Sequence, residues 1–182
     1  MIVATYFTDR KYRAFAKRLA ETCSDLALHC AVYAERDTGS WEKNVYKKPH
    51  VVMKALNDYP SESILFIDAD AALVSYPQEL VVNDWDMACY FEGPKKPVSG
   101  TVFVKNNDRA RAFVSEWASG CDRGTHENED YHWMRLALEK SYGLRVGHLP
   151  PSYFWVERSM RGRFPMAVPV VNHYVIGEHT FQ

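Results

Sequence analysis

The stretch Ile64-Leu65-Phe66-Ile67-Asp68-Ala69-Asp70 decides the fold of this chain. Four consecutive apolar residues are typical of a central strand that is covered on both faces. In an open α/β sheet, ligands bind beyond the carboxyl ends of such strands. Two carboxylates one residue apart converge there on one point, and they repel each other unless a cation lies between them. The stretch therefore predicts a metal or phosphate site, and the alternative is that Asp68 and Asp70 only cap the turn.

Apolar runs and helical periodicities alternate on both sides of this stretch. Further strands are predicted at residues 2–8, 29–34, 87–91, 101–104 and 168–171, and helices at residues 12–28, 49–57, 108–120 and 128–141. The polar stretch 35–47, which contains Gly39-Ser40, is predicted to be a loop. Strands that alternate with helices predict an α/β three-layer sandwich with a mostly parallel central sheet. A chain of 182 residues without a linker or repeat is expected to form one domain over residues 1–182.

The bulk composition excludes several classes of protein. A net charge of −1 gives no global field for nucleic acid or an anionic membrane, although this sum leaves room for a local basic patch. The four cysteines form no C-x-x-C pair, so neither a zinc knuckle nor a thioredoxin-like site is indicated. The sequence starts without a signal-peptide pattern and has no apolar run approaching a membrane span. A cytoplasmic location is therefore expected.

Two known chemistries use a pair of aspartates after a hydrophobic strand. In phosphatases of the haloacid-dehalogenase type the first aspartate, here Asp68, is a nucleophile and the second is a general acid. That motif normally continues with Thr or Val on the first strand, whereas here Ala71-Ala72-Leu73 follows the third predicted strand. In glycosyltransferases of the GT-A fold, a D-x-D pair holds a metal ion against the diphosphate of a sugar nucleotide. The position of this pair fits the second chemistry better.

Several segments resemble the nucleotide-diphospho-sugar transferase family. Lys48-Pro49, a helix and then Ile64 to Ala71 resemble its core signature, and Ser99-Gly100-Thr101-Val102-Phe103-Val104 is similar to its "(S/T)G" strand beside the sugar site. Asn128-Glu129-Asp130-Tyr131 is similar to its "N-x-D-(Q/E)" helix, except that Tyr131 replaces Gln or Glu.

Two further segments follow in the order that this family has. Leu149-Pro150-Pro151-Ser152-Tyr153-Phe154-Trp155 is similar to its "LP-x-x-Y-(C/F)-W" segment, and His173 matches the C-terminal His of GT-A enzymes. The resemblance implies a GT-A-like, Rossmann-like fold and transfer of a sugar from a nucleoside-diphosphate-sugar, in particular a UDP-sugar, with Mn²⁺ or Mg²⁺. The acceptor stays open between a saccharide, a protein, a small molecule and a modified nucleic-acid base. A non-catalytic nucleotide-sugar-binding module is an alternative, as is the phosphatase.

The resemblance also implies roles for individual residues. Asp70 would bind the metal directly, Asp68 would contact the ribose or a metal-bound water, and His173 would be the third protein ligand. His179 competes with His173 for that role. Asp130 would be a base toward the acceptor or a contact of donor hydroxyls, and its alternative is a first-turn acid favoured by the helix dipole. The predicted donor contacts are Thr5, Tyr6, Thr8, Lys48, Asp68, Ser99 and Gly100.

Two features near the end of the chain are open to two interpretations each. Arg158, Arg161 and Arg163 would close over the diphosphate as a lid or contact an anionic acceptor, or they lie in a solvated loop. Trp155 would provide a stacking surface for a sugar ring, or it belongs to the core.

Overall fold

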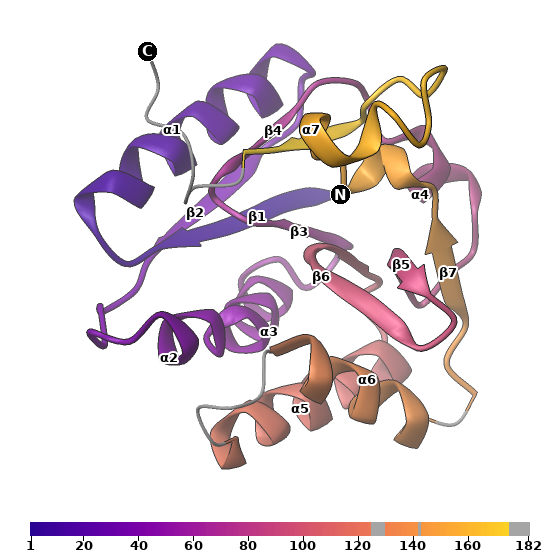
Figure 1. Ribbon diagram of the computed structural model, residues 1–182. Helices are drawn as coiled ribbons and strands as arrows, with labels where there is room; N and C mark the ends of the chain where they lie inside the picture. The colour runs from indigo at the N-terminus through magenta and orange to yellow at the C-terminus, as the bar shows by residue number, and fades with distance from the viewer. Residues whose placement is uncertain (125–129, 142, 175–182) are drawn as a thin grey trace.

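A six-stranded sheet organises the fold of the computed structural model, which describes residues 1–124, 130–141 and 143–174 (Figure 1). The strand order is β2-β1-β3-β6-β5-β7, and β4 and β8 form a second, two-stranded sheet. The strands are β1 Ile2–Phe7, β2 Cys30–Ala34, β3 Ile64–Ile67, β4 Ala71–Leu73, β5 Met87–Gly93, β6 Lys96–Val104, β7 Val146–Leu149 and β8 Val171–His173. Neighbours pair in parallel except β3–β6 and β5–β6, so the predicted mostly parallel sheet is confirmed.

Helices cover both faces of the large sheet and complete three layers (Figure 1). The helices are α1 Arg10–Asp25, α2 Trp41–Val45, α3 Lys48–Asp58, α4 Gln78–Val82, α5 Asp108–Arg123, α6 Asp130–Lys140 and α7 Glu157–Met160, with a 3₁₀ turn η1 at Pro151–Tyr153. Helix α1 packs on β1, β2 and β4, whereas α3 packs on β1 and β3 from the other face and contacts α5. The predicted α/β sandwich is therefore confirmed.

The burial of β3 explains its unbroken apolar sequence. All four side chains are fully buried. Ile64 and Phe66 belong to the core cluster on the α3 side, and Leu65 and Ile67 belong to the cluster on the α1 side. Each buried side chain of this size contributes about 1.5–3 kcal/mol relative to exposure. A strand with two buried faces therefore holds the following Asp68-Ala69-Asp70 turn in place.

Some predicted elements differ from the structure. The stretch 35–47 was predicted to be a loop, but it contains α2, whose N-terminus is capped by the Ser40 hydroxyl accepting from the Lys43 N–H at 3.3 Å. Strand β6 begins at Lys96, five residues before the predicted Thr101. The last strand is Val171–His173 and not 168–171, because pairing with β4 begins only at Val171.

A buried aspartate ties the edge of the sheet to α5. The Asp86 carboxylate accepts from Asn107 Nδ2 at 2.8 Å, from Arg109 Nε at 3.0 Å and from the Arg145 N–H at 2.9 Å. Burial raises the pKa of Asp86, but hydrogen bonds from Arg145 and Arg109 outweigh it and hold the pKa well below its usual range. Asp86 therefore stays ionised while it is fully buried.

We expect Asp86→Ala to lower the free energy of unfolding by about 3 kcal/mol, at the lower end of the range for a broken buried ion pair because both arginines are half exposed. A carboxyl whose folded pKa is depressed stabilises the fold above its unfolded pKa and loses this contribution as pH falls toward the folded value. The difference between wild type and variant should thus shrink below about pH 4. Urea unfolding across this pH range measures it, and a constant difference would contradict the assignment.

Candidate active site

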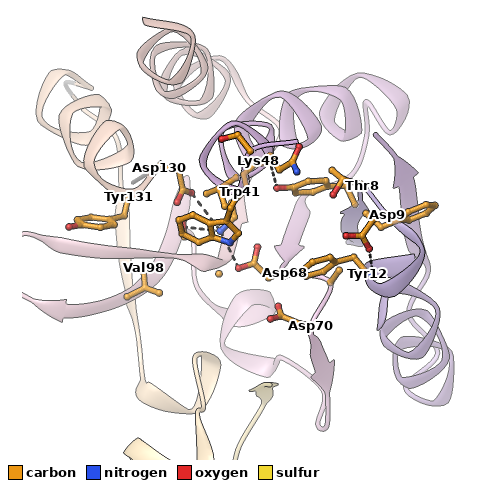
Figure 2. A pocket seen from close by; sticks show the side chains of 18 of the residues that line it. Thr8, Asp9, Tyr12, Trp41, Lys48, Asp68, Asp70, Val98, Asp130 and Tyr131 are labelled. Carbon is orange, nitrogen blue, oxygen red and sulfur yellow. Dashed lines mark hydrogen bonds and ion pairs between the residues drawn. The ribbon is translucent and has the colours of Figure 1, made fainter. Parts of the chain in front are cut away.

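A cavity of about 600 Å³ lies where β1, β3 and the start of β6 meet the N-termini of α2, α3 and α6 (Figure 2). It is lined by Tyr6, Phe7, Thr8, Asp9, Tyr12, Asp37, Gly39, Ser40, Trp41, Asn44, Val45, Lys48, Asp68, Ala69, Asp70, Glu92, Lys96, Pro97, Val98, Ser99, Gly100, Asp130, Tyr131 and Phe154. Carboxylates, one buried lysine and several aromatic rings thus surround one space. Such a mixture suits a ligand with both charged and ring-shaped parts.

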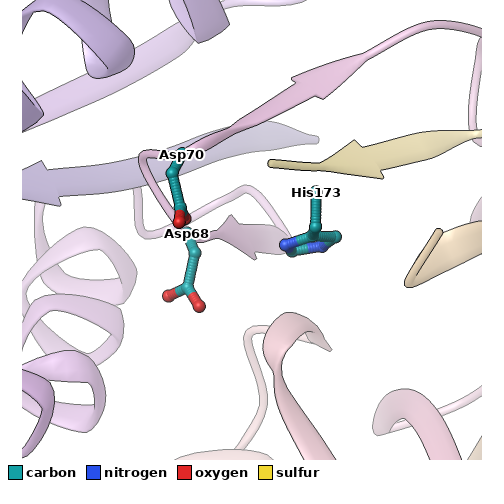
Figure 3. Close-up of side chains that lie close together, drawn as sticks. All are labelled: Asp68, Asp70 and His173. Carbon is teal, nitrogen blue, oxygen red and sulfur yellow. The ribbon is translucent and has the colours of Figure 1, made fainter. Parts of the chain in front are cut away.

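Backbone hydrogen bonds place His173 beside the Asp68-Ala69-Asp70 turn. The turn connects β3 to β4, and the Asp68 N–H donates to the Gly100 carbonyl at 2.9 Å. Strand β4 pairs antiparallel with β8, in a register that sets Ala71 opposite His173. One ligand atom each of Asp68, Asp70 and His173 lies within 4.8 Å of the others (Figure 3). The sheet β4–β8 therefore joins residues that lie about a hundred positions apart in the sequence.

The environment of His173 keeps its imidazole neutral. Burial, with a smaller contribution from the charge of Lys48, lowers the pKa of His173 to about 3. Its Nε2 lies 2.8 Å from the Thr101 hydroxyl, and the Phe154 ring packs 4.6 Å from the imidazole. These contacts fix the orientation of the ring, as the second layer of residues does around metal-binding histidines. A neutral imidazole is the form that binds a transition metal.

Burial makes the ionised forms of Asp68 and Asp70 unfavourable. Burial raises the pKa of Asp68 to about 7, an effect that Lys48 opposes and Asp70 reinforces. Burial also raises the pKa of Asp70 above its usual value. A divalent cation would relieve this cost, and two carboxylates with one imidazole are a donor set that suits Mn²⁺ and also accepts Mg²⁺. The residues therefore fit the predicted metal ion.

Lys48 links the turn to the sugar-site segments predicted from sequence. It lies at the start of α3 with only 7% of its surface exposed, and Nζ donates to Asp68 Oδ2 at 3.1 Å and to the Ser99 hydroxyl at 3.2 Å. Asp130 Oδ2 is 3.7 Å from the same Nζ. Asp130 is 4% exposed, and this oxygen makes no hydrogen bond within the described part of the chain. This buried carboxylate oxygen thus pairs with Lys48 by charge, at the wall of the cavity.

The predicted donor contacts divide into two groups. Tyr6, Thr8, Lys48, Asp68, Ser99 and Gly100 all line the cavity. Tyr6 is held by its hydroxyl, which donates to the Asn44 carbonyl at 2.8 Å, and by stacking on Phe66. Thr5 is fully buried and is not among the residues that line the cavity. The structure does not place its side chain where a nucleotide would contact it.

Apart from Phe154, the segment after β7 does not line this cavity. Trp155 is fully buried, and its indole N–H donates to Glu157 Oε2 at 2.6 Å. Of its two predicted roles, it therefore belongs to the core and does not offer a stacking surface to a sugar ring. Arg158, Arg161 and Arg163 are exposed and do not line the cavity. Arg161 pairs with Glu157 at 2.8 Å and lies over the Trp155 ring. His179, and Asn128 and Glu129 of the motif before Asp130, lie outside the described residues.

Trp41 and Tyr12 are among the aromatic residues of the cavity that were not predicted from sequence. Trp41, 60% exposed, comes from α2, and Tyr12 comes from the first turns of α1. An exposed aromatic ring at the wall of a cavity is available to stack on a ring-shaped part of a ligand. The signal in the sequence was a tryptophan directly after Gly39-Ser40 in an otherwise polar stretch.

Close packing beside the candidate metal site, formed by Asp68, Asp70 and His173, requires a glycine at position 100. A Cβ at this position would lie 2.8 Å from the Phe154 ring, 3.0 Å from His173 Cε1 and 3.2 Å from Asp68 Oδ2. We expect Gly100→Ala to displace these side chains, to destabilise the fold by about 1–3 kcal/mol and to weaken Mn²⁺ binding at least tenfold. Calorimetry with Mn²⁺ and UDP measures the second effect. Gly93→Ala, where a Cβ would meet nothing within 4 Å, is the matched control.

Comparisons with known proteins agree on the fold. No protein-family model matches the chain, and no curated protein matches it. Among solved structures, the chain is similar to a glycosyltransferase involved in the glycosylation of the major capsid of PBCV-1, with a TM-score of 0.74 and 13% identity over 94% of this chain and 92% of that one. The chain has a GT-A-like glycosyltransferase fold.

Two longer proteins contain the same fold. The apo-form glycosyltransferase GlyE of Streptococcus pneumoniae TIGR4 has a TM-score of 0.67 and 11% identity, over 99% of this chain and 56% of GlyE. The bifunctional WbbM has a TM-score of 0.62 and 12% identity, over 96% of this chain and 45% of WbbM. The chain thus spans about half the length of these two proteins. None of its described helices has the length and apolarity needed to cross a membrane.

Proposed function

We propose that the chain is a metal-dependent glycosyltransferase, which transfers a sugar from a nucleoside-diphosphate-sugar, a UDP-sugar, to a hydroxyl of an acceptor. The observation that carries this proposal is the convergence of Asp68, Asp70 and His173 beside the cavity of a glycosyltransferase fold. The glycosyltransferase matched over 92% of its length is involved in the glycosylation of a viral major capsid, which supports the same reaction class.

We assign separate roles in the reaction to the residues at the cavity. Asp70, Asp68 and His173 would hold Mn²⁺ or Mg²⁺, which when bound neutralises the charge that builds on a departing nucleoside diphosphate. Lys48 opposes the rise in the pKa of Asp68 and places a positive charge at the cavity, where the anionic donor would lie. Asp130, at the wall of the cavity beside Lys48, would accept a hydrogen bond from a donor or acceptor hydroxyl. Positioning and charge stabilisation thus carry the catalysis.

Calorimetry with UDP, in Mn²⁺ and in EDTA, tests the site, and a panel of sugar nucleotides then tests turnover by slow donor hydrolysis. We expect UDP to bind only with the metal and at least one donor to be hydrolysed. Binding without any turnover would favour the non-catalytic module. A phosphoenzyme trapped at Asp68 would favour the phosphatase, and equal UDP binding in EDTA would contradict the metal site.

A further inference from the structure

The first half of α1 concentrates positive charge in a chain whose net charge is −1. Residues 10–18 contain five basic side chains and no acidic one, and all five are exposed. They are Arg10, Lys11, Arg13, Lys17 and Arg18. Arg18 donates to the Tyr174 hydroxyl at 2.9 Å, and Lys17 lies 3.6 Å from Glu21 on the surface. These residues form a local basic patch, which a net charge of −1 does not exclude.

Helix stability does not account for this charge. The N-terminal end of a helix carries the positive pole of its dipole, which favours acidic side chains in the first turn. The first turn of α1 has no acidic residue, and Arg10, Lys11 and Arg13 stand there in their place. Apart from the N-cap Asp9, this end of the helix is basic, and its exposed side chains attract anionic groups.

A groove lies between these side chains and the edge of the sheet. The apolar side chains of Phe7, Ala14, Ala20 and Val32 and the basic side chains of Arg10, Arg13 and Lys17 line it, and its volume is about 470 Å³. Val32 is 39% exposed although it is a β-branched residue in a strand. We call this surface the α1–β2 groove. Its apolar residues and its charge together fit a ligand with both apolar and acidic groups.

Strand β2 forms one border of the α1–β2 groove and is an outer strand. In the sheet formed by the described residues, β2 pairs only with β1. An edge strand presents one row of backbone N–H and C=O groups to a further strand. Since side chains alternate along a strand, every second side chain of an added strand would point over the groove.

We propose that the α1–β2 groove binds an extended, acidic segment of a partner polypeptide, which adds to β2 as a further strand. The backbone of the segment pairs with β2, its apolar side chains cover Val32 and Phe7, and its carboxylates meet Arg10, Arg13 and Lys17. A phosphate backbone or a lipid surface would use the charge but not the strand edge. Phe7 also lines the catalytic cavity, so the bound segment ends beside its mouth. The proposal does not depend on the transferase reaction.

The test uses the full chain and a short fluorescent peptide in which glutamate and valine alternate. Fluorescence anisotropy should show saturable binding below about 1 mM. The variant R10E/R13E/K17E should weaken binding at least about tenfold. The variant K95E/R123E/K140E, with the same change in charge, should not, because its residues are exposed on the β5–β6 connection and on the helices across the sheet from α1 (Figure 1).

A second arm tests the strand pairing on the wild-type chain and does not need a variant to fold. Methylation of alternate backbone nitrogens in the peptide removes its hydrogen bonds to β2 and keeps its charge, so binding should be lost. Undiminished binding of the methylated peptide would overturn the strand addition. Absence of binding to the unmodified peptide, or binding only to phosphatidylglycerol vesicles or to an oligothymidylate, would overturn the polypeptide partner.

Discussion

Replacing Asp70 with alanine should lower Mn²⁺-dependent hydrolysis of the proposed UDP-sugar donor by about a hundredfold or more. Asp70 supplies one of the two carboxylates of the candidate metal site, and a metal ion contributes several kcal/mol of charge stabilisation in such reactions. Asp68 and His173 alone form an incomplete donor set. Initial rates at saturating Mn²⁺, together with calorimetry of UDP and Mn²⁺, measure the loss.

The stability of the same variant separates a metal ligand from a structural residue. Because burial raises the pKa of Asp70, its ionised form is disfavoured in the metal-free chain, so Asp70→Ala should unfold in EDTA at the wild-type temperature or above it. Mn²⁺ and UDP should raise the unfolding temperature of the wild type but not of the variant. Asp25→Ala, an exposed carboxylate at the end of α1, is the matched control. Binding of UDP–Mn²⁺ by Asp70→Ala with wild-type affinity would contradict the proposed metal site.

The part of the fold that the sequence predicts is the part that local physics determines. Four adjacent apolar residues of β3 leave both faces of the strand apolar, so a buried central strand follows without knowledge of its neighbours. Carboxylates directly after such a strand must lie at the edge of the sheet. The Asp68-Ala69-Asp70 turn could therefore be placed from sequence, whereas its contact with His173 required the resemblance, because it depends on the pairing of β4 with β8.

The start of β6 illustrates what a hydrophobic pattern leaves out. Residues 96–100 lie in the strand, yet they line the cavity and include small and polar residues. The strand-like run Thr101-Val102-Phe103-Val104 therefore gave a predicted strand that begins only at Thr101. The two-residue connection from Gly93 to Lys96 was the available signal, since so short a connection requires an antiparallel hairpin.

Helix α2 escaped prediction for a related reason. The five residues of α2 have no buried side chain, and the cap at Ser40 stabilises the helix instead of an amphipathic face. Trp41 thus reaches the cavity from a stretch that reads as a polar loop. For the arginines after Trp155 the sequence left a lid and a solvated loop open. In the structure they are exposed and do not line the cavity, and their direction depends on the tertiary contacts of α7. Charge alone does not reveal whether a basic segment faces the donor.

Replacing Lys48 with methionine should have the largest effect on stability, lowering the free energy of unfolding by about 3–5 kcal/mol. Methionine keeps much of the buried volume but removes the charge, so Asp68 and Asp130 lose the cation that lies 3.1 and 3.7 Å from their oxygens. Uncompensated carboxylates in a buried site are more costly than the lost attraction itself. Urea unfolding in EDTA measures the effect, and Lys54→Met, at an exposed position of the same helix, is the control.

A double-mutant cycle assigns the cause of this loss. If the unpaired carboxylate of Asp130 is responsible, Asp130→Asn should cost less in the Lys48→Met background than in the wild type, with a coupling energy of about 0.5–3 kcal/mol. Additive effects would instead assign the loss to the packing of α3, and a stable Lys48→Met variant would contradict the importance of the ion pairs. Donor hydrolysis by the double variant should stay at least about a hundredfold below wild type, because restored stability does not restore the positive charge beside the diphosphate.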